Sequence, residues 1–244
     1  MSGSDTSIRL CVEQPLGVAQ QVVLGRDQSH YLVNVMRRVQ GDRLALFNCR
    51  DGEWRAEITA ADKRGTTLRC LDQTRPQDMP PDLWLLFAPV KKARTDFIVE
   101  KAAELGARRI VPVQTDHTNA ERIRRDRLQA HAVEAAEQCG GLFVPEVADP
   151  VPLQRLLDSW DPARQVMFCD EQLAGATRRP LPDRGGEPWA VLIGPEGGFS
   201  DAERRRLVAL DFCHPVSLGP RILRADTAAV AALTLWQSRL GDWA

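Results

Sequence analysis

The sequence lacks an apolar run long enough to cross a membrane. Its longest apolar stretch, residues 228–235, is short, rich in alanine and interrupted by Thr234. The first ten residues, MSGSDTSIRL, also lack the apolar core of a secretory signal. From these absences we expect a cytoplasmic protein with no membrane partner.

Paired cysteines and clustered metal ligands are lacking as well. The six cysteines show no CxxC spacing, and the four histidines share no spacing typical of a metal site. We therefore expect no disulfide framework and no metal. Neither charge dominates, because 32 basic residues against 33 acidic residues give a net charge of −1. This balance argues against a protein that coats nucleic acid by bulk charge, but it leaves room for a local basic site.

Two styles of sequence meet near residue 75. Residues 8–71 contain short alternating segments bounded by turns, which predict a small β-barrel over residues 1–74. The segment QTRPQDMPPD that follows is rich in proline and has little to bury. It predicts a linker over residues 75–82.

Two local signals stand out in the first of these parts. Asp51-Gly52, between two apolar segments, predicts a hairpin with a tight two-residue turn. Residues 29–39 have apolar side chains at helical spacing. This spacing predicts a helix with Ser29 as its N-cap.

From Leu83 onward, continuous apolar strands alternate with helices. The strands read LWLLFAPV, IVPV, VMFC and WAVLI, followed by residues 215–218. The helices are expected over residues 95–105, 122–139, 201–210 and 226–240. This alternation predicts an α/β domain over residues 83–244, with a mostly parallel sheet covered on both faces. In such sheets, ligands bind beyond the carboxyl ends of the strands.

One glycine-rich loop, IGPEGGFSDAE, starts at the end of the strand WAVLI and covers residues 193–203. Its three glycines allow the backbone to approach a ligand closely. Ser200 and Glu203 have the spacing of a capping box that begins the next helix. The loop matches neither a P-loop nor a dinucleotide-binding fingerprint. On pattern alone, an ordinary turn between a strand and a helix is as good an interpretation.

A second loop, SLGPRILRADTAAVAAL, covers residues 217–233. Arg221 and Arg224 flank two apolar residues, and Asp226 or Thr227 is expected to begin a helix. On local pattern alone, an N-cap aspartate and two surface arginines are the simpler interpretation. The helix itself is apolar on nearly every side, so it must be buried in the core or against another subunit.

Together, GPEGGFSDAE and LGPRILRADTA resemble the C-terminal signature of the bacterial 16S ribosomal RNA (uracil-N3)-methyltransferases, the RsmE family of the SPOUT superfamily. The resemblance extends along the chain. HYLVNVMRRVQGD is similar to part of that family's N-terminal PUA-like module. KKARTDFIVEKAAELGARRIVP and EAAEQCGGLFVPE are similar to its central blocks. Two long motifs in the family's order make this a more specific signal than GPEGG alone.

The resemblance implies a C-terminal sheet tied into a trefoil knot, a homodimer, and S-adenosylmethionine as the cofactor. Three loops would hold the cofactor: residues 168–171, 193–198 and 217–223. The cofactor contacts implied are Phe168, Leu192, Ile193, Gly194, Pro195, Glu196, Gly197, Gly198, Ser217, Leu218, Gly219, Arg221, Ile222, Leu223 and Thr227.

Catalytic roles follow from the implied reaction. The uracil N3 proton is weakly acidic, so it must be removed or the developing anion stabilised. Arg224 can stabilise that anion, and Asp226 can orient Arg224 or accept the proton. Glu196 is a rival acceptor. The family usually has glutamate where this chain has Asp226, so this assignment is less direct than the others.

The implied partner is 16S rRNA within the 30S subunit. Two basic groups are expected to contact it: His30, Arg37 and Arg38 in the first part of the chain, and Lys91, Lys92 and Arg94 after the first apolar strand. Gly141 and Phe143 replace positions that are often basic in the family, which puts RNA contact there in doubt. Two alternatives remain: another SPOUT RNA methyltransferase acting on tRNA or a ribose hydroxyl, and a non-catalytic RNA-binding assembly factor.

Overall fold

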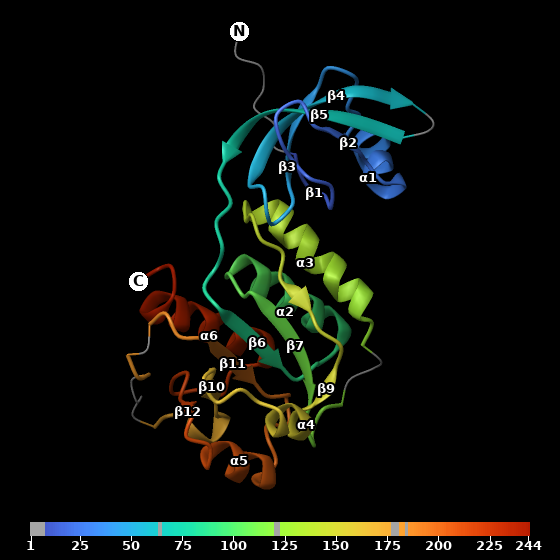
Figure 1. Ribbon diagram of the computed structural model, residues 1–244. Coiled ribbons are helices and arrows are strands. Elements are labelled where there is room, and N and C mark those ends of the chain that lie inside the picture. The colour runs from blue at the N-terminus through green and yellow to red at the C-terminus, as the bar shows by residue number, and fades with distance from the viewer. Residues whose placement is uncertain (1–7, 63–64, 120–122, 177–180, 184) are drawn as a thin grey trace. The chain divides into compact units, whose positions relative to one another are not determined.

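The computed structural model describes residues 8–62, 65–119, 123–176, 181–183 and 185–244 (Figure 1). The chain divides into two compact units. The first comprises Met1–Met79 and Ala136–Phe143, and the second comprises Pro80–Ala135 and Val144–Ala244. The sequence did not predict that residues 136–143 would join the first unit. In the described residues, no helix is long and apolar enough to span a membrane.

The first unit is built on a five-stranded sheet with the order β1-β3-β4-β5-β2. β1 pairs with β3 in parallel, and the other neighbours are antiparallel. Within the described residues β1 and β2 are the two edges, so the sheet is a curled half-barrel, which agrees in part with the small β-barrel expected from the sequence. The strands are β1 (Arg9–Cys11), β2 (Gln21–Val23), β3 (Arg43–Phe47), β4 (Glu53–Asp62) and β5 (Gly65–Arg75).

The predicted helix over residues 29–39 is shorter and begins earlier. α1 (Arg26–His30) continues directly into η1 (Tyr31–Val35), which has π-helical geometry. Ser29 is therefore inside the helix, and its prediction as N-cap is wrong. Its buried Oγ instead accepts a hydrogen bond from the backbone N–H of Thr66 at 3.1 Å. Tertiary contact with β5 determines the role of this serine, and a local pattern cannot show that.

The turn between β3 and β4 also differs from its prediction. Five residues, 48–52, connect the strands, so the two-residue turn is wrong. Positive φ values occur at Cys49 (61°) and Gly52 (74°). The Asp51 carboxylate accepts hydrogen bonds from the Leu16 backbone N–H and from the Asn48 side chain. A hydrogen bond from the Leu16 backbone, with another from Asn48, lowers the pKa of Asp51. The loop is therefore organised by side-chain hydrogen bonds to an aspartate.

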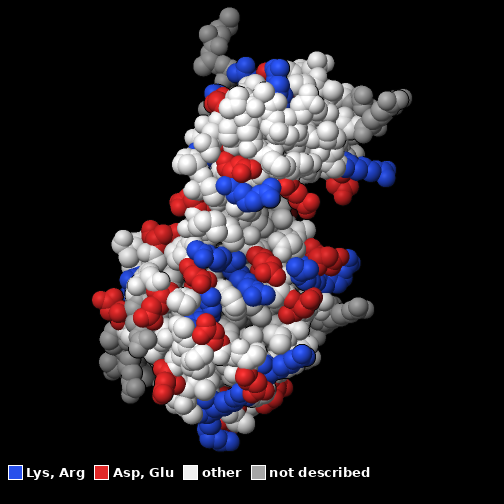
Figure 2. All heavy atoms as spheres, in the orientation of Figure 1, with Lys and Arg blue, Asp and Glu red and all other residues white. Residues whose placement is uncertain are grey.

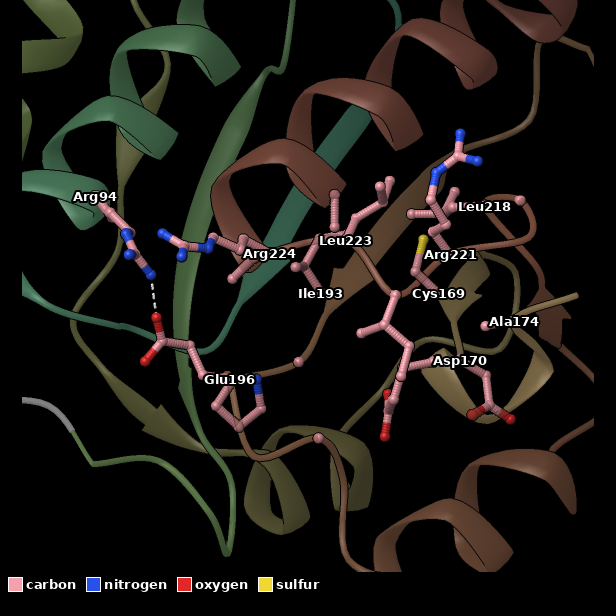
Figure 3. A pocket seen from close by; sticks show the side chains of 18 residues that line it. Arg94, Cys169, Asp170, Ala174, Ile193, Glu196, Leu218, Arg221, Leu223 and Arg224 are labelled. Carbon is pink, nitrogen blue, oxygen red and sulfur yellow. Dashed lines mark hydrogen bonds and ion pairs between the residues drawn. The ribbon is translucent and has the colours of Figure 1, made fainter.

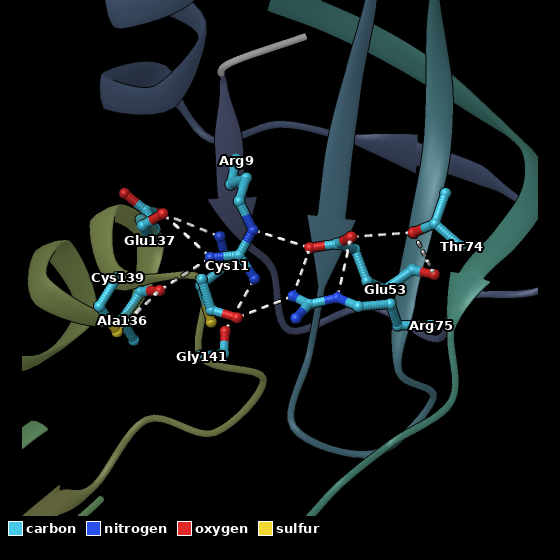
Figure 4. Close-up of polar contacts among 10 residues, drawn as sticks. Arg9, Cys11, Glu53, Thr74, Arg75, Ala136, Glu137, Cys139 and Gly141 are labelled. Atoms are coloured by element: carbon cyan, nitrogen blue, oxygen red, sulfur yellow. Dashed lines mark hydrogen bonds and ion pairs between the residues drawn. The ribbon is translucent and has the colours of Figure 1, made fainter. Parts of the chain in front are cut away.

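A network of arginines holds residues 136–143 within the first unit (Figure 4). Arg9 Nη2 donates to the carbonyl oxygen of Gly141 at 2.8 Å, and its Nη1 donates to two carbonyls in the last turn of α3 at 2.9 and 3.0 Å. Glu53 accepts from Arg9 at 2.7 Å and from Arg75 at 2.9 Å. The arginines thus satisfy carbonyls that a helix C-terminus leaves free, and Glu53 fixes both arginines.

We expect this network to make the first unit sensitive to acid. Burial alone would raise the pKa of Glu53, but hydrogen bonds from Arg75, Arg9 and Thr74 outweigh it and hold the pKa below its usual range. A lowered pKa in the folded state means that the stabilisation is complete above the ordinary value of about 4.5 and is lost as the pH falls through the folded value. Hydrogen exchange in β1–β5 at pH values from 6 downward should therefore show less acid destabilisation in Glu53→Gln than in the wild type. Asp72→Asn, which removes an exposed ion pair, is the control. Equal acid dependence in the wild type and Glu53→Gln would contradict the prediction.

The second unit is built on a seven-stranded sheet with the order β12-β10-β11-β6-β7-β8, and β9 also pairs with β7. All of its pairs are parallel, which confirms the predicted parallel sheet. Its strands are β6 (Leu83–Phe87), β7 (Arg109–Gln114), β8 (Glu146–Val147), β9 (Val151–Pro152), β10 (Gln165–Cys169), β11 (Trp189–Ile193) and β12 (Cys213–Val216).

Two apolar cores cover the faces of this sheet. Side chains alternate along β6: Leu83, Leu85 and Phe87 enter one core, while Trp84 and Leu86 enter the other. The first core includes residues from α2, α3 and α6, and the second includes residues from α4 and α5. The helices are α2 (Lys92–Glu104), α3 (Arg125–Cys139), α4 (Leu153–Asp158), η2 (Glu171–Leu173), α5 (Asp201–Val208) and α6 (Ala225–Leu240).

Candidate active site

A pocket of about 320 Å³ lies at the carboxyl ends of β10 and β11 in the second unit (Figure 3). Three loops contribute to it: those that follow β10, β11 and β12. Arg94 from α2 and two alanines from α6 complete the wall. The lining residues are Arg94, Cys169, Asp170, Glu171, Ala174, Ile193, Gly194, Pro195, Glu196, Gly198, Leu218, Gly219, Arg221, Ile222, Leu223, Arg224, Ala225 and Ala228.

Most residues expected to bind the cofactor lie in this wall. They are Ile193, Gly194, Pro195, Glu196, Gly198, Leu218, Gly219, Arg221, Ile222 and Leu223. Phe168, Leu192, Gly197, Ser217 and Thr227 do not line it. The side chains of Phe168 and Leu192 are fully buried in the apolar core between the sheet and α5, because alternate side chains of a strand point to its faces.

The glycine-rich loop after β11 needs glycine at two positions. A Cβ atom at Gly194 would come within 2.6 Å of the Phe199 ring. Gly198 has φ +70°, and a Cβ atom there would overlap the carboxylate of Glu171. That carboxylate accepts a hydrogen bond from the Phe199 N–H at 3.2 Å. The loops after β10 and β11 are therefore in direct contact where they meet the pocket.

The start of α5 fixes the other end of the glycine-rich loop. The Glu203 N–H donates to Ser200 Oγ at 3.2 Å, and the Ser200 N–H donates to Glu203 Oε2 at 2.9 Å. The predicted capping box is thus confirmed. Glu203 Oε1 also accepts from the N–H of Asp116 at 2.9 Å, and Ser200 Oγ donates to Asp116 at 2.6 Å. The loop after β7 is therefore tied to the loop after β11.

His117 completes this connection, and sequence reasoning missed it. Its Nδ1 lies 3.1 Å from the carbonyl oxygen of Gly197 and 3.2 Å from that of Gly198. Because both partners are acceptors, Nδ1 must carry the proton. The only signal in the sequence was its position just after a strand that ends at the ligand-binding edge.

We expect His117→Leu to weaken binding of S-adenosylmethionine about fivefold, which is the cost of one lost hydrogen bond. His117→Asn should restore most of the affinity, because the asparagine amide can donate from a similar position. Calorimetric titration of the two variants checks this. Equal affinities in His117→Leu and the wild type would mean that the histidine does not position the loop.

Arg94 contacts two carboxylates at or near the pocket. Arg94 Nη1 pairs with the carboxylate of Glu196 (Figure 3). Its Nε lies 3.8 Å from Asp226 Oδ2. The sequence assigned Arg94 to RNA contact, whereas the structure places it in the pocket wall beside both candidate proton acceptors. Lys91 and Lys92, grouped with it by sequence, are exposed at the start of α2 and do not line the pocket.

Arg224 occupies the N-cap position of α6 and lines the pocket. Helix α6 begins at Ala225, so neither Asp226 nor Thr227 is its first residue, and Asp226 is not its N-cap. Within the described part of the chain, Arg224 has no ion pair, and the charged partner of Asp226 is Arg94. The contacts therefore give no support to the hypothesis that Asp226 orients Arg224.

Two other polar side chains line the pocket, Asp170 and Cys169. The Asp170 side chain is 1% exposed and forms an ion pair with Arg204 at 2.8 Å. It also accepts a hydrogen bond from the Gln172 N–H at 3.0 Å, as the cap of η2. Burial raises the pKa of the Cys169 thiol, so this cysteine stays neutral and is unsuited to act as a nucleophile.

The remaining predicted RNA contacts lie in the first unit. His30 is the last residue of α1 and is exposed. Arg37 is exposed with φ 54°. Arg38 is partly buried, and its Nε donates to no acceptor among the described residues. On the face shown in Figure 2, basic and acidic side chains are interspersed, consistent with the near-zero net charge. RNA contact on this face would therefore be local.

Comparison with known proteins shows that the chain matches two families of RNA methyltransferase domains. The family described as RNA methyltransferase domain matches residues 77–237, and the RNA methyltransferase PUA domain matches residues 24–69. The chain belongs to the family of ribosomal RNA small subunit methyltransferase E, which confirms the resemblance seen in the sequence.

Two relatives and one solved structure illustrate this membership. The relative from Synechocystis is 31% identical over 231 residues, which cover 92% of this chain and 75% of the relative. The relative from Rickettsia conorii is 27% identical over 226 residues, which cover 92% of this chain and 93% of the relative. The crystal structure of the Neisseria gonorrhoeae enzyme bound to S-adenosylmethionine has a TM-score of 0.86 and 26% identity, and the match covers 97% of this chain and 99% of that one.

Proposed function

We propose that this chain transfers a methyl group from S-adenosylmethionine to N3 of a uracil in 16S rRNA of the small ribosomal subunit. The observation that carries the proposal is the pocket itself. Its walls include the loops after β11 and β12, which contain the two sequence motifs of the family. It lies at the edge of a parallel sheet where ligands bind. S-adenosylmethionine supplies an electrophilic methyl group on a positively charged sulfur.

The residues present fit such a cofactor. Gly194 and Gly198 allow the loop after β11 to pack against Phe199 and Glu171, because a Cβ atom at either position would collide with those side chains. Apolar side chains of Leu218, Leu223 and Ala228 line part of the wall and suit the flat adenine group. We assign the adenine contact to the loop after β12, and the contact with the ribose and methionine part to the loop after β11.

The polar residues suit proton removal from a uracil. Arg224 presents a guanidinium without an ion pair among the described residues, and it can stabilise negative charge as N3 loses its proton. We assign the proton acceptor to Glu196, because Glu196 lines the pocket and Asp226 does not. Asp226 then serves to hold Arg94, which in turn holds Glu196. The target base must leave its stack, because N3 lies on its pairing edge.

We further propose that the second unit contains a trefoil knot. In its sheet, β11 lies between β10 and β6, whereas β12 pairs on the other side of β10. The chain therefore crosses past β10 to form β12, and then returns to α6, which packs against α2 and β11. These crossings support a threaded arrangement of the loops that form the pocket.

A homodimer acting in the cytoplasm on the 30S subunit is part of the same proposal. Ile222 lines the pocket with 73% of its surface exposed, and Phe97 on α2 is 39% exposed. Exposed large apolar side chains such as these, of which Ile222 lines the pocket, favour burial by a second copy.

The two basic residues after η1 allow a test of RNA binding by the first unit. Changing Arg37 and Arg38 together to alanine should weaken RNA binding and reduce its dependence on salt, with affinity for S-adenosylmethionine unchanged. Filter binding across a salt series measures the RNA affinity and its dependence on salt. Arg69→Ala, at an exposed position on β5, is the control. An unchanged salt slope in the double variant would remove these residues from the RNA contact.

Mass mapping of modified nucleosides in a strain lacking this gene tests the proposed function. Loss of one 3-methyluridine from 16S rRNA is the expected result. Loss of a methyl group from tRNA or from a ribose hydroxyl would favour a different target. If every methylated nucleoside remained, a non-catalytic assembly role would account for the chain better.

A further inference from the structure

A second pocket, of about 590 Å³, opens in the second unit at the opposite edge of the sheet. Trp84 is the second residue of β6, Arg109 is the first of β7, and Arg164 directly precedes β10. These strands begin at this pocket and end at the edge that carries the methyltransferase pocket. The lining residues are Trp84, Arg109, Val111, Arg125, Glu146, Ala148, Asp149, Val151, Leu156, Ser159, Trp160, Asp161 and Arg164.

Stacked arginines and tryptophans form one wall of this pocket. The rings of Trp84 and Trp160 meet edge to face with their centres 6.0 Å apart. The Cζ atoms of Arg164 and Arg109 lie 3.9 and 4.8 Å from the centre of the Trp84 ring. Arg164 is fully engaged, because both of its terminal nitrogens donate to Asp82, at 3.0 and 2.9 Å. Its role is therefore structural, and it holds Trp84 in place.

Arg109 and Arg125, in contrast, have donors to spare. Arg109 Nε is buried and has no hydrogen-bond acceptor among the described residues; it forms an ion pair with Glu146 Oε2 at 3.7 Å, beyond hydrogen-bond distance. Arg125 Nε donates to the carbonyl oxygen of Val147 at 2.7 Å, and no acceptor is recorded in the described residues for its terminal nitrogens. Buried donors without an acceptor are rare in native proteins. Arg109 Nε is such a buried donor, whereas Arg125 is exposed; both guanidiniums line the pocket, where they suit an anionic group such as a phosphate.

Three carboxylates in the same pocket narrow the class of ligand. Glu146, Asp149 and Asp161 line it together with the arginines. A site for phosphate alone would be weakened by these negative charges. A nucleotide with an amino-bearing base needs both signs, because its phosphate accepts hydrogen bonds while its exocyclic amino group donates them. The base can stack on aromatic rings or on a guanidinium plane.

We propose that this pocket binds a nucleotide with an amino-bearing base, guanine in the first instance. Arg109 and Arg125 hold the phosphate, and the Asp149 and Asp161 carboxylates accept from the amino edge of the base. Uracil has no exocyclic amino group, so this ligand differs from the base to be methylated. The ligand is either an unpaired nucleotide of a bound RNA or a free nucleotide. The inference concerns a separate pocket and does not rest on the proposed methyltransferase function.

The test is calorimetric titration of the full-length chain, saturated with S-adenosylmethionine, with GMP, UMP and inorganic phosphate. GMP should bind with a Kd below about 1 mM and at least about tenfold more tightly than UMP or phosphate. Arg109→Gln and Arg125→Gln should each weaken GMP about tenfold, since each removes a charge-assisted hydrogen bond. Arg155→Gln, on the exposed surface of α4 and outside the pocket, should leave GMP binding unchanged.

Unchanged affinity for S-adenosylmethionine in all three variants shows that they are folded. A guanine-containing single-stranded oligoribonucleotide distinguishes the sources of the ligand. If it binds with the same dependence on Arg109 and Arg125, the ligand is RNA, and if only GMP does so, the ligand is a free nucleotide. Absence of GMP binding, equal binding of GMP and phosphate, or GMP binding that neither variant alters would overturn the proposal.

Discussion

Replacing Arg224 by lysine should lower the rate of methyl transfer about a hundredfold while leaving the affinity for S-adenosylmethionine within about twofold of the wild type. Arg224 stands at the N-cap of α6, in the pocket wall, and has no ion pair among the described residues. Its guanidinium is therefore available to stabilise charge on the uracil. Lysine keeps the positive charge but loses the planar pair of donors that an oxyanion can use together.

Single-turnover methyl transfer to 30S subunits, with cofactor affinity measured separately, tests this expectation. Arg239→Lys, at an exposed position in the last turn of the same helix, is the matched control. Glu196→Gln belongs in the same series, because removing the proposed proton acceptor should slow the step while Asp226→Asn slows it less. A normal rate in Arg224→Lys would remove this arginine from the mechanism.

Replacing Gly198 by valine should weaken the binding of S-adenosylmethionine at least about a hundredfold. At φ +70° a β-branched residue is strained, and its Cβ atom would overlap the Glu171 carboxylate. The displaced groups are the loops after β10 and β11, and both line the pocket. Methyl transfer should be lost together with binding.

Gly197→Ala is the informative control for this variant. The sequence treats Gly197 and Gly198 alike, but Gly197 does not line the pocket, and a Cβ atom there would lie 3.3 Å from Cβ of His117. We therefore expect Gly197→Ala to weaken cofactor binding only a few-fold, by disturbing the contact with His117. Equal losses in both variants would show that the loop tolerates no side chain anywhere, and the structural distinction between the two glycines would be wrong.

The residues that could be predicted are those whose role depends on the spacing of residues close together in the sequence. Continuous apolar strands gave the parallel sheet, and Ser200 with Glu203 gave the capping box, because both follow from short-range spacing. The glycine-rich loop was identified from its glycines, and the structure requires Gly194 and Gly198 there because a Cβ atom would collide with Phe199 or Glu171. Family resemblance then supplied the cofactor, which no pattern of spacing could have identified.

The residues that were missed or given the wrong role depend on contacts between distant segments. Arg94 precedes Glu196 by about a hundred residues, so only the folded sheet brings α2 beside the loop after β11. His117 acts on Gly197 and Gly198 for the same reason. Ser29 was predicted to be an N-cap from the local pattern alone. That pattern could not show that its hydrogen-bond partner, Thr66, lies on another element. In each case a tertiary contact outweighs the local preference of the residue.

The most direct test of the account follows the methyl group itself. The full-length chain is incubated with S-adenosylmethionine labelled in the methyl group and with 30S subunits from a strain lacking the gene, and the labelled nucleoside is identified after digestion of the rRNA. The account predicts a single labelled product, 3-methyluridine from 16S rRNA, and no product with Gly198→Val. Label on a ribose, on another base or on tRNA alone, or no label from a chain that binds S-adenosylmethionine, would contradict it.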